Sequence, residues 1–465
     1  MVLKLFDTMT KKKKIFKPLK DKEVKMFVCG QTVYDDAHLG HAKTYVNFDI
    51  LARFLRYLGY KLHYIQNITD IDDKIINRAK EKGEHPLKLA EHFTKRFFED
   101  IERLKIKETI NDFPKSTDYI PQMIDQINTL LKKGYAYVVD GDVYFDVSKF
   151  KDYTKLSRMK LKDLEKHRIE PDERKRNSYD FSLWKSAKLD EISWDSPFGK
   201  GRPGWHIEDT AITVTIFGPQ YDIHGGANEL IFPHHTNEIA QAEAATGIKP
   251  FVKYWLHSGV LNIRGQKMSK SLKNFITIRE ALEKYSPETL RLWIASTHYR
   301  KPIDYNEKDL EVAKKKVEKI KLTLERINEN YSKAGKGEFF VNKIKKLRKE
   351  FLDAMNDDIN TPLALTKYFE LITLINKQID KNQFSKHDLK LAEETMKEFG
   401  NLFQIIPELE KKELPKEVLE LIKKRETMRK IGDFETADKI RNEIKERFGI
   451  ILEDTKEGVK WKFVE

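Results

Sequence analysis

The stretch MFVCGQTVYDDAHLGHAKTY, residues 26–45, decides the fold, because it joins a strand pattern to a helix pattern through a loop. The apolar run Val24–Val28 ends at a Cys-Gly pair and predicts a short strand. Residues 41–60 carry apolar side chains at helical spacing up to Gly59, which predicts a helix. A second strand pattern follows at residues 61–70. Strand, helix and strand over this length form a βαβ unit, so we predict a parallel sheet of Rossmann type.

The middle of the chain interrupts this pattern. Residues 86–134 are predicted to be helical, and residues 135–147 to form a hairpin with Asp140-Gly141 at its turn. The polar, basic stretch 148–203 breaks the α/β alternation and is interpreted as an insertion. Strand and helix signals then resume near Trp205 and continue to about residue 262. We therefore expect the sheet to be built from two separate parts of the chain.

The last third of the chain is predicted to be mainly helical. From about residue 308, apolar side chains follow a 4-3-4-3 spacing with lysines opposite, as in an amphipathic helix. Further helices are predicted at 342–356, 362–378 and 386–403, and a helix with two short strands in the final segment. The predicted fold class is therefore α/β: a Rossmann-type parallel-sheet domain with an insertion, an α-helical bundle and a small α+β C-terminal domain.

Composition and charge restrict the class of protein. A chain of 465 residues is too long to fold around a single hydrophobic core, so two to four domains are expected. A net charge of +13 suits a partner with a phosphate backbone, although a highly charged surface explains it equally well. Residues 311–350 hold 13 Lys/Arg and 6 Asp/Glu, a local +7. A single cysteine excludes an internal disulfide, and the N-terminus has no apolar signal segment, so a soluble, cytoplasmic protein without membrane contact is expected.

Two histidines stand at the predicted start of the first long helix, in the motif His38-Leu39-Gly40-His41. A helix N-terminus presents backbone N–H groups and a positive dipole end to an anion. Gly40 permits close approach of a ligand, and both imidazoles are able to donate to phosphate oxygens. On its own this motif is weak, since histidines in such a loop usually have a structural role.

A second motif lies far downstream in RGQKMSKSLKNF, residues 264–275. Lys267 and Lys270 bring two ammonium groups, with two serine hydroxyls between and after them. Such a loop suits the clamping of a polyphosphate in its transition state. The alternative, an exposed basic turn, would be preferred if the motif stood alone.

Together the two motifs resemble the HIGH and KMSKS signatures of class I aminoacyl-tRNA synthetases, with Leu39 as the one departure. The stretches FVCGQTVYDDAHLGH, NITDIDDKII, GRPGWHIE, DIHGGANELIFPHHTNEIAQAEA and KMSKSLKNF resemble the cysteinyl-tRNA synthetases in particular. The similarity continues through DDINTPLAL to the C-terminal segment and covers essentially the whole chain. The resemblance implies ATP-dependent ligation of L-cysteine to tRNA(Cys) through a cysteinyl-adenylate.

The resemblance also implies one zinc ion (Zn²⁺) per chain, held by Cys29, Asp209, His234 and Glu238. Asp209 is a departure, because the family motif WHIEC is WHIED here. Aspartate preserves the charge of a thiolate, and zinc accepts carboxylate oxygen, although the site becomes harder. His234 and Glu238 stand at i and i+4 after Pro233, so they share one helix face. His235 is an alternative ligand, and a metal-free pocket remains an alternative reading.

In that family, zinc binds the substrate thiolate and thereby rejects serine, which a pocket of suitable shape alone does poorly. The resemblance assigns His38, His41, Lys267 and Lys270 to catalysis at the ATP phosphates, with Mg²⁺ accompanying ATP. For ATP binding it adds Gly225 and Gly226 beside His38, His41 and Lys270. The expected cysteine-binding residues are Gly30, Thr32, Thr69, Trp205, His224 and Glu229.

The expected partners are ATP, L-cysteine and tRNA(Cys), and the protein is expected to be a monomer. The catalytic domain is expected in two halves, at 1–110 and 204–262, with the insertion between them at 111–203. The KMSKS and stem-contact region is expected at 263–307. The tRNA-binding bundle is expected at 308–405 and the anticodon-binding domain at 406–465. Two alternatives stay open. One is a ligase that joins cysteine to an amino-sugar, which has no use for a basic helical C-terminus. The other is a catalytically inactive RNA-binding relative.

Overall fold

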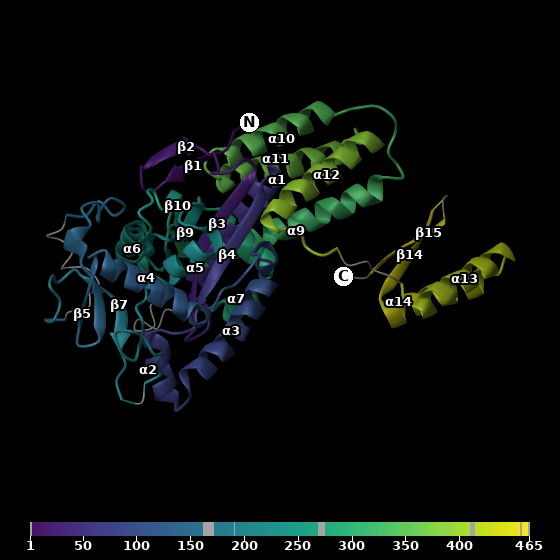
Figure 1. The fold of residues 1–465 in the computed structure, drawn as a ribbon. Coiled ribbons are helices and arrows are strands. Elements are labelled where there is room, and N and C mark those ends of the chain that lie inside the picture. Colours follow the sequence, from purple (N-terminus) through teal and green to yellow (C-terminus); the bar gives the residue numbers. More distant parts are fainter. Residues whose placement is uncertain are drawn as a thin grey trace. The chain divides into compact units, whose positions relative to one another are not determined.

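The computed structural model describes residues 2–160, 172–189, 191–267, 275–409, 414–455 and 458–463. Within residues 1–407, four strands form a parallel sheet in the order β10-β9-β3-β4 (Figure 1). The strands are β3 (Glu23–Thr32), β4 (Lys61–Thr69), β9 (Tyr221–Ala227) and β10 (Val252–Ser258). Helix α1 (Leu39–Tyr57) connects β3 to β4, which confirms the predicted βαβ unit.

The order of the strands indicates where this sheet can bind a ligand. The chain leaves β3 toward β4 on one side, whereas β9 and β10 lie on the other side of β3. Ligands of open α/β sheets bind at such a switch point, beyond the carboxyl ends of the strands. Cys29 lies near the end of β3, and His224 lies on the neighbouring strand β9. The sequence motifs therefore converge at the position where this fold accepts a ligand.

Helices cover both faces of the sheet. Phe27 and Cys29 of β3 pack with side chains of α5 (Ile207–Phe217) and α6 (Thr236–Thr246). Helix α1 covers the opposite face, where the Phe48 ring lies directly against Gly225. Around this core lie α2 (Asp73–Lys82), α3 (Pro86–Arg103) and the short turns Lys107–Thr109, Ser116–Tyr119, Val147–Lys149, Asn228–Leu230 and Ile231–His235.

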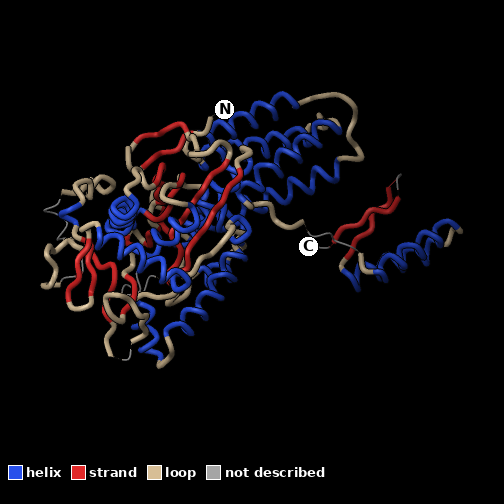
Figure 2. The backbone as a smooth tube through the Cα atoms, viewed as in Figure 1, coloured by secondary structure: helices blue, strands red, loops and turns tan. Residues whose placement is uncertain are grey.

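The middle of the chain forms a second sheet, which is antiparallel and has the order β5-β6-β7-β8. In Figure 2 its strands form a group apart from the parallel sheet. The predicted hairpin is confirmed as β5 (Ala136–Val139) and β6 (Asp142–Phe145). The polar stretch after it supplies β7 (Phe181–Ser186) and β8 (Gly201–Pro203), which sequence periodicity did not reveal. Helix α4 (Ile120–Lys132) shares a core with this sheet.

Two smaller sheets contain the other strands that the structure describes before residue 408. An N-terminal hairpin joins β1 (Lys4–Asp7) to β2 (Lys12–Ile15). A three-stranded sheet contains β11 (Leu261–Ile263), β12 (Gln266–Lys267) and β13 (Ile303–Tyr305), and α7 (Ile278–Lys284) and α8 (Pro287–Ala295) lie between β12 and β13 in the chain.

Four long helices follow and form the bundle that the sequence predicts, shown in green in Figure 1. They are α9 (Glu307–Asn330), α10 (Val341–Asn356), α11 (Thr361–Asp380) and α12 (Lys386–Phe403). The predicted apolar stripe of α9 is buried throughout, from Ala313 to Ile327. Among the described residues, none of the helices combines the length and the apolar character needed to cross a lipid bilayer.

Residues 408–465 form a compact unit of their own. It contains α13 (Lys416–Lys430), α14 (Phe434–Phe448), β14 (Ile450–Thr455) and β15 (Gly458–Phe463). The two strands pair antiparallel, and the apolar sides of both helices pack on them around Val418, Ile444 and Leu452. The expected helix with two short strands is thus present, preceded by one more helix.

A buried arginine connects the bundle to the helix that covers the parallel sheet. The Arg291 guanidinium of α8 pairs with the Asp49 carboxylate of α1, and both side chains are fully buried. Arg291 also donates from Nε to the carbonyl of Phe403 at 2.6 Å and from Nη1 to that of Leu104 at 2.8 Å. One side chain therefore joins α1, α8 and the end of α12.

We expect Asp49→Ala to lower the free energy of unfolding by about 3–5 kcal/mol, because it leaves a buried guanidinium without its counter-charge. Urea unfolding followed by circular dichroism measures the change. Glu91→Gln is the matched control, since it breaks the exposed pair between Glu91 and Lys95 in α3 and is expected to leave the unfolding curve in place. Equal curves for both variants would show that the buried pair contributes nothing.

Candidate active site

A cavity of about 680 Å³ opens at the carboxyl ends of β3 and β9. Residues from both halves of the sheet and from the inserted antiparallel sheet line it. Seven of the residues predicted from the sequence are among them: Cys29, Gly30, Thr32, His38, His41, Trp205 and Glu229. The volume suits a ligand the size of a nucleotide or an aminoacyl-adenylate.

The two histidines of the first motif cap helix α1 reciprocally. His38 is the N-cap residue, and its Nδ1 accepts from the backbone N–H of His41 at 3.3 Å. His41 Nδ1 accepts in turn from the backbone N–H of His38 at 3.3 Å, and the rings stack with centroids 3.8 Å apart. Because Nδ1 is the acceptor in both rings, each neutral ring carries its proton on Nε2. Burial lowers the pKa of His41 well below its usual value, so that ring stays neutral at physiological pH.

The C-terminal flank of the second motif lies beside this turn. The backbone N–H of Leu39 donates to the carbonyl of Ile276 at 3.0 Å, and that of Ile278 donates to the carbonyl of Ala37 at 2.9 Å. The Phe275 ring meets the His38 ring edge-on at 5.1 Å. Lys267 ends β12, but its side chain and the whole of Lys270 lie outside the described residues. The C-terminal flank of the KMSKS segment thus adjoins the HLGH turn.

The four predicted metal ligands converge in a buried cluster behind the cavity. Cys29 Sγ lies 3.4 Å from Asp209 Oδ2. His234 Nε2 lies 2.9 Å from Asp209 Oδ2 and 3.1 Å from Glu238 Oε1. His234 lies in the turn Ile231–His235 and α6 begins only at Thr236, so the helix starts later than Pro233, yet the i, i+4 pair still meets.

Supporting groups hold this cluster in place. Asn67 on β4 donates from Nδ2 to Asp209 Oδ1 at 2.7 Å, which turns Oδ2 toward the cluster. The backbone N–H of Gly30 donates to Asn67 Oδ1 at 2.7 Å. A Cβ atom at position 30 would lie only 1.6 Å from the Asn67 carbonyl oxygen, so this approach requires glycine. His206 Nδ1 lies 2.9 Å from His234 Nδ1 on the other side.

The cluster has the electrostatic character of a metal site. Burial and then the carboxylates of Asp209 and Glu238 raise the pKa of the Cys29 thiol well above its usual value. Burial also raises the pKa of Glu238, and neither of its carboxylate oxygens accepts an aligned hydrogen bond within the described part of the chain. A divalent cation would stabilise both anionic groups at once. The sulfur, nitrogen and oxygen donors are therefore compatible with zinc.

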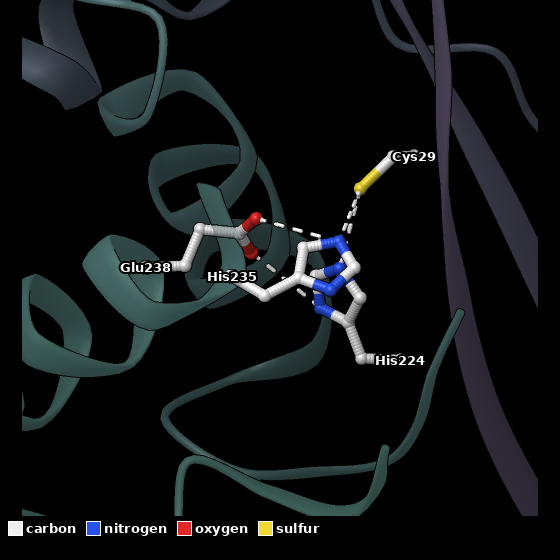
Figure 3. Close-up of side chains that lie close together, drawn as sticks. All are labelled: Cys29, His224, His235 and Glu238. Carbon is white, nitrogen blue, oxygen red and sulfur yellow. Dashed lines mark hydrogen bonds and ion pairs between the residues drawn. The ribbon is translucent and has the colours of Figure 1, made fainter. Parts of the chain in front are cut away.

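Two further histidines face the same sulfur (Figure 3). His224 Nε2 lies 3.4 Å and His235 Nε2 lies 3.1 Å from Cys29 Sγ. With Cys29 and Glu238 they form a second group of four possible ligands. Burial lowers the pKa of both rings well below the usual value, so they are neutral and able to act as ligands. The sequence signals for this group were the paired histidines of FPHH and the histidine of DIHGG, which was expected to contact the substrate.

The remaining predicted residues lie behind the cavity wall. Among the described lining residues, none is Thr69, His224, Gly225 or Gly226. Thr69 Oγ1 donates to Glu208 Oε1 at 2.7 Å. A Cβ atom at Gly225 would lie 2.4 Å from the Phe48 ring, and one at Gly226 would lie 2.9 Å from His235 Cε1. Both glycines thus make room for rings of the protein itself.

Two family models match separate parts of the chain, the part with the parallel sheet and the end of the helical bundle. Residues 15–315 match the family model described as the catalytic domain of class I (C) tRNA synthetases, and residues 350–407 match the DALR domain. Cysteine–tRNA ligase of Thermococcus onnurineus is 47% identical over 475 residues, and that of Pyrococcus horikoshii is 48% identical over 481. Cysteine–tRNA ligase of Aquifex aeolicus is 41% identical over 493 residues, and each alignment covers 99% of both chains.

A solved structure shares the fold. Mycobacterium tuberculosis methionyl-tRNA synthetase in complex with methionyl-adenylate superimposes with a TM-score of 0.61 at 16% identity, over 83% of this chain and 90% of that chain. The parallel sheet, the HLGH turn and the matched catalytic-domain model together define a class I aminoacyl-tRNA synthetase architecture. Since its full-length relatives share 41–48% of their residues with it, the chain belongs to the cysteine–tRNA ligase family.

Proposed function

We propose that the chain attaches L-cysteine to tRNA(Cys) in two steps driven by ATP. The cysteine carboxylate attacks the α-phosphorus of ATP, which forms cysteinyl-adenylate and releases pyrophosphate. The terminal ribose hydroxyl of the tRNA then attacks the activated carbonyl, and AMP leaves. The full-length identity to cysteine–tRNA ligases is the observation that carries the proposal.

Both nucleophiles belong to the substrates, so the protein has to align them and stabilise developing charge. His38 and His41 carry N–H protons on Nε2 and donate to the phosphate oxygens of ATP. Lys267 and Lys270 bind the departing pyrophosphate, while Mg²⁺ enters with ATP and offsets its charge. The contacts between the C-terminal flank of the KMSKS segment and the HLGH turn support this division of roles.

Cysteine binds at the floor of the cavity, in front of the metal ligands. A zinc ion held there would supply a coordination position that suits the substrate thiolate and does not suit a serine hydroxyl. Cys29, Asp209, His234 and Glu238 hold the ion, and Asn67 orients the Asp209 carboxylate. Trp205 lines the cavity and stacks on the His234 ring with centroids 4.3 Å apart, which places this ligand beside the cavity. Gly30, Thr32 and Glu229 surround the amino acid.

The helical bundle and the C-terminal unit are proposed to bind the tRNA. Lysines of residues 311–350, with a local charge of +7, position phosphates, and the unit 408–465 contacts the anticodon. The other domain roles stay as expected from the sequence, with the KMSKS and stem contact within 263–307. A monomer in the cytoplasm is proposed, since each chain carries a complete set of site residues.

The test is attachment of labelled amino acids to purified tRNA transcripts. Cysteine on tRNA(Cys), with serine at background, is the expected result. Transfer of cysteine to an amino-sugar with no labelled tRNA would favour the alternative ligase. Binding of tRNA without any cysteine-dependent pyrophosphate exchange would favour the inactive relative. Either outcome would refute the proposed reaction.

A further inference from the structure

Cys29 and Glu238 belong to two overlapping groups of ligands. The aspartate position comprises Cys29, Asp209, His234 and Glu238, and the histidine position comprises Cys29, His224, His235 and Glu238. We infer that a divalent ion occupies these two positions alternatively, and that in the absence of cysteine the ion is held at the histidine position. Because both positions need the same thiolate and carboxylate, the chain still binds one ion. The inference rests on the proposed function only in taking the pocket to bind zinc.

The histidine position is built with supporting hydrogen bonds. His235 Nδ1 lies 2.8 Å from His257 Nε2, and His257 Nδ1 lies 2.7 Å from Thr8 Oγ1. His224 Nδ1 lies 2.6 Å from the Tyr221 hydroxyl. Histidines that bind metals almost always have their second ring nitrogen bonded in this way. Both Nε2 atoms are therefore directed at the sulfur of Cys29 by partners on the far side of each ring.

The distances are close to those of a tetrahedral zinc site. Zinc–sulfur and zinc–nitrogen bonds of about 2.3 and 2.0–2.1 Å place a sulfur and a nitrogen ligand roughly 3.6 Å apart. The observed Cys29–His224 and Cys29–His235 distances are 3.4 and 3.1 Å. Glu238 Oε1 lies 4.0 Å from His235 Nε2. Small shifts of both rings and a rotation of the Glu238 carboxylate, whose Oε2 lies 3.5 Å from His224 Nδ1, would convert the group into a ligand set.

Donor chemistry favours the histidine position in the free protein. It supplies one sulfur, two imidazole nitrogens and one carboxylate, whereas the aspartate position supplies one sulfur, one nitrogen and two carboxylates. Thiolate and imidazole are favoured ligands of zinc, whereas harder ions prefer carboxylates. In addition, Asp209 and His234 already contact each other at 2.9 Å, while His224 and His235 face a thiol, which is a weak hydrogen-bonding partner.

Access separates the two positions as well. His224 and His235 are fully buried and pack on Trp255, with ring centroids 4.4 and 5.2 Å apart. His234 instead stacks on Trp205, which lines the cavity. A substrate thiolate that enters the cavity therefore meets the ion on the aspartate side. The histidine position retains the ion between turnovers, which offsets the loss of the family's second cysteine at position 209.

X-ray absorption at the zinc edge of the full chain tests the inference directly. One sulfur and two imidazoles are expected for the cysteine-free protein, and two sulfurs with one imidazole once cysteine is bound. One imidazole in the cysteine-free protein would overturn the inference. Two imidazoles retained with cysteine bound would overturn it too, because the ion would then have a single position.

Variants give a second readout through competition with a zinc chelator. His235→Gln is expected to weaken zinc binding by at least about 10-fold, the loss that even a supporting residue causes. Asp209→Asn alters the aspartate position alone, so in the cysteine-free protein it is expected to weaken zinc binding less than His235→Gln does. A larger loss for Asp209→Asn than for His235→Gln would refute the inference. Cysteine attachment by the wild type, measured separately, keeps this result distinct from a failure of the proposed function.

Discussion

His38→Asn is expected to lower cysteine-dependent exchange of pyrophosphate into ATP by about 10²–10³-fold, with little change in the thermal unfolding midpoint. Asparagine is among the best N-cap residues, and its Oδ1 replaces Nδ1 as acceptor for the backbone N–H of His41. What the variant loses is the N–H donor at the Nε2 position. The variant therefore separates the helix-capping role of His38 from its role in catalysis.

The matched variant is His38→Gln, whose amide nitrogen reaches farther but whose oxygen is poorly placed to cap α1. It is expected to retain more exchange activity than His38→Asn and to cost about 1 kcal/mol of stability through loss of the cap. Differential scanning calorimetry and the exchange assay on the same preparations give both numbers. Exchange by His38→Asn within about 3-fold of wild type would show that the turn serves only to start the helix.

Cys29→Ser is expected to have the largest effect on the metal, since this sulfur belongs to both groups of ligands. Serine is nearly isosteric but does not ionise at neutral pH, so zinc affinity should fall by more than the roughly 10–100-fold caused by losing a supporting hydrogen bond. Selection of cysteine over serine should fall with it. Metal analysis by mass spectrometry, together with charging by both amino acids, measures the two losses.

Asp209→Cys provides the control for that experiment, because it restores the WHIEC pattern of the family and adds a thiolate. The variant is expected to bind zinc at least as tightly as the wild type, with cysteine attachment preserved. If Cys29→Ser kept a stoichiometric ion and full selectivity, the metal-based account of cysteine recognition would be wrong.

Local periodicity was sufficient for much of the fold. The helix that ends near Gly59 and the stripe from Ala313 to Ile327 formed as predicted, because each pattern reports which side of one element is buried. The strand expected at Val24–Val28 also formed, but it continues through Cys29 to Thr32. The i, i+4 spacing of His234 and Glu238 likewise survives a late start of α6. Strands β7 and β8 escaped prediction, since their pairing partners rather than their own composition make them strands.

The sequence by itself therefore determined the βαβ unit, the bundle and, through its motifs, the family. Only the tertiary structure decided which side chains meet. It placed His224 and His235 against Cys29 and bonded Asn67 to Asp209. The physical reason is that these contacts join segments as far as 206 residues apart. The distances between these side chains depend on how the sheet and the helices pack, which local sequence patterns do not predict.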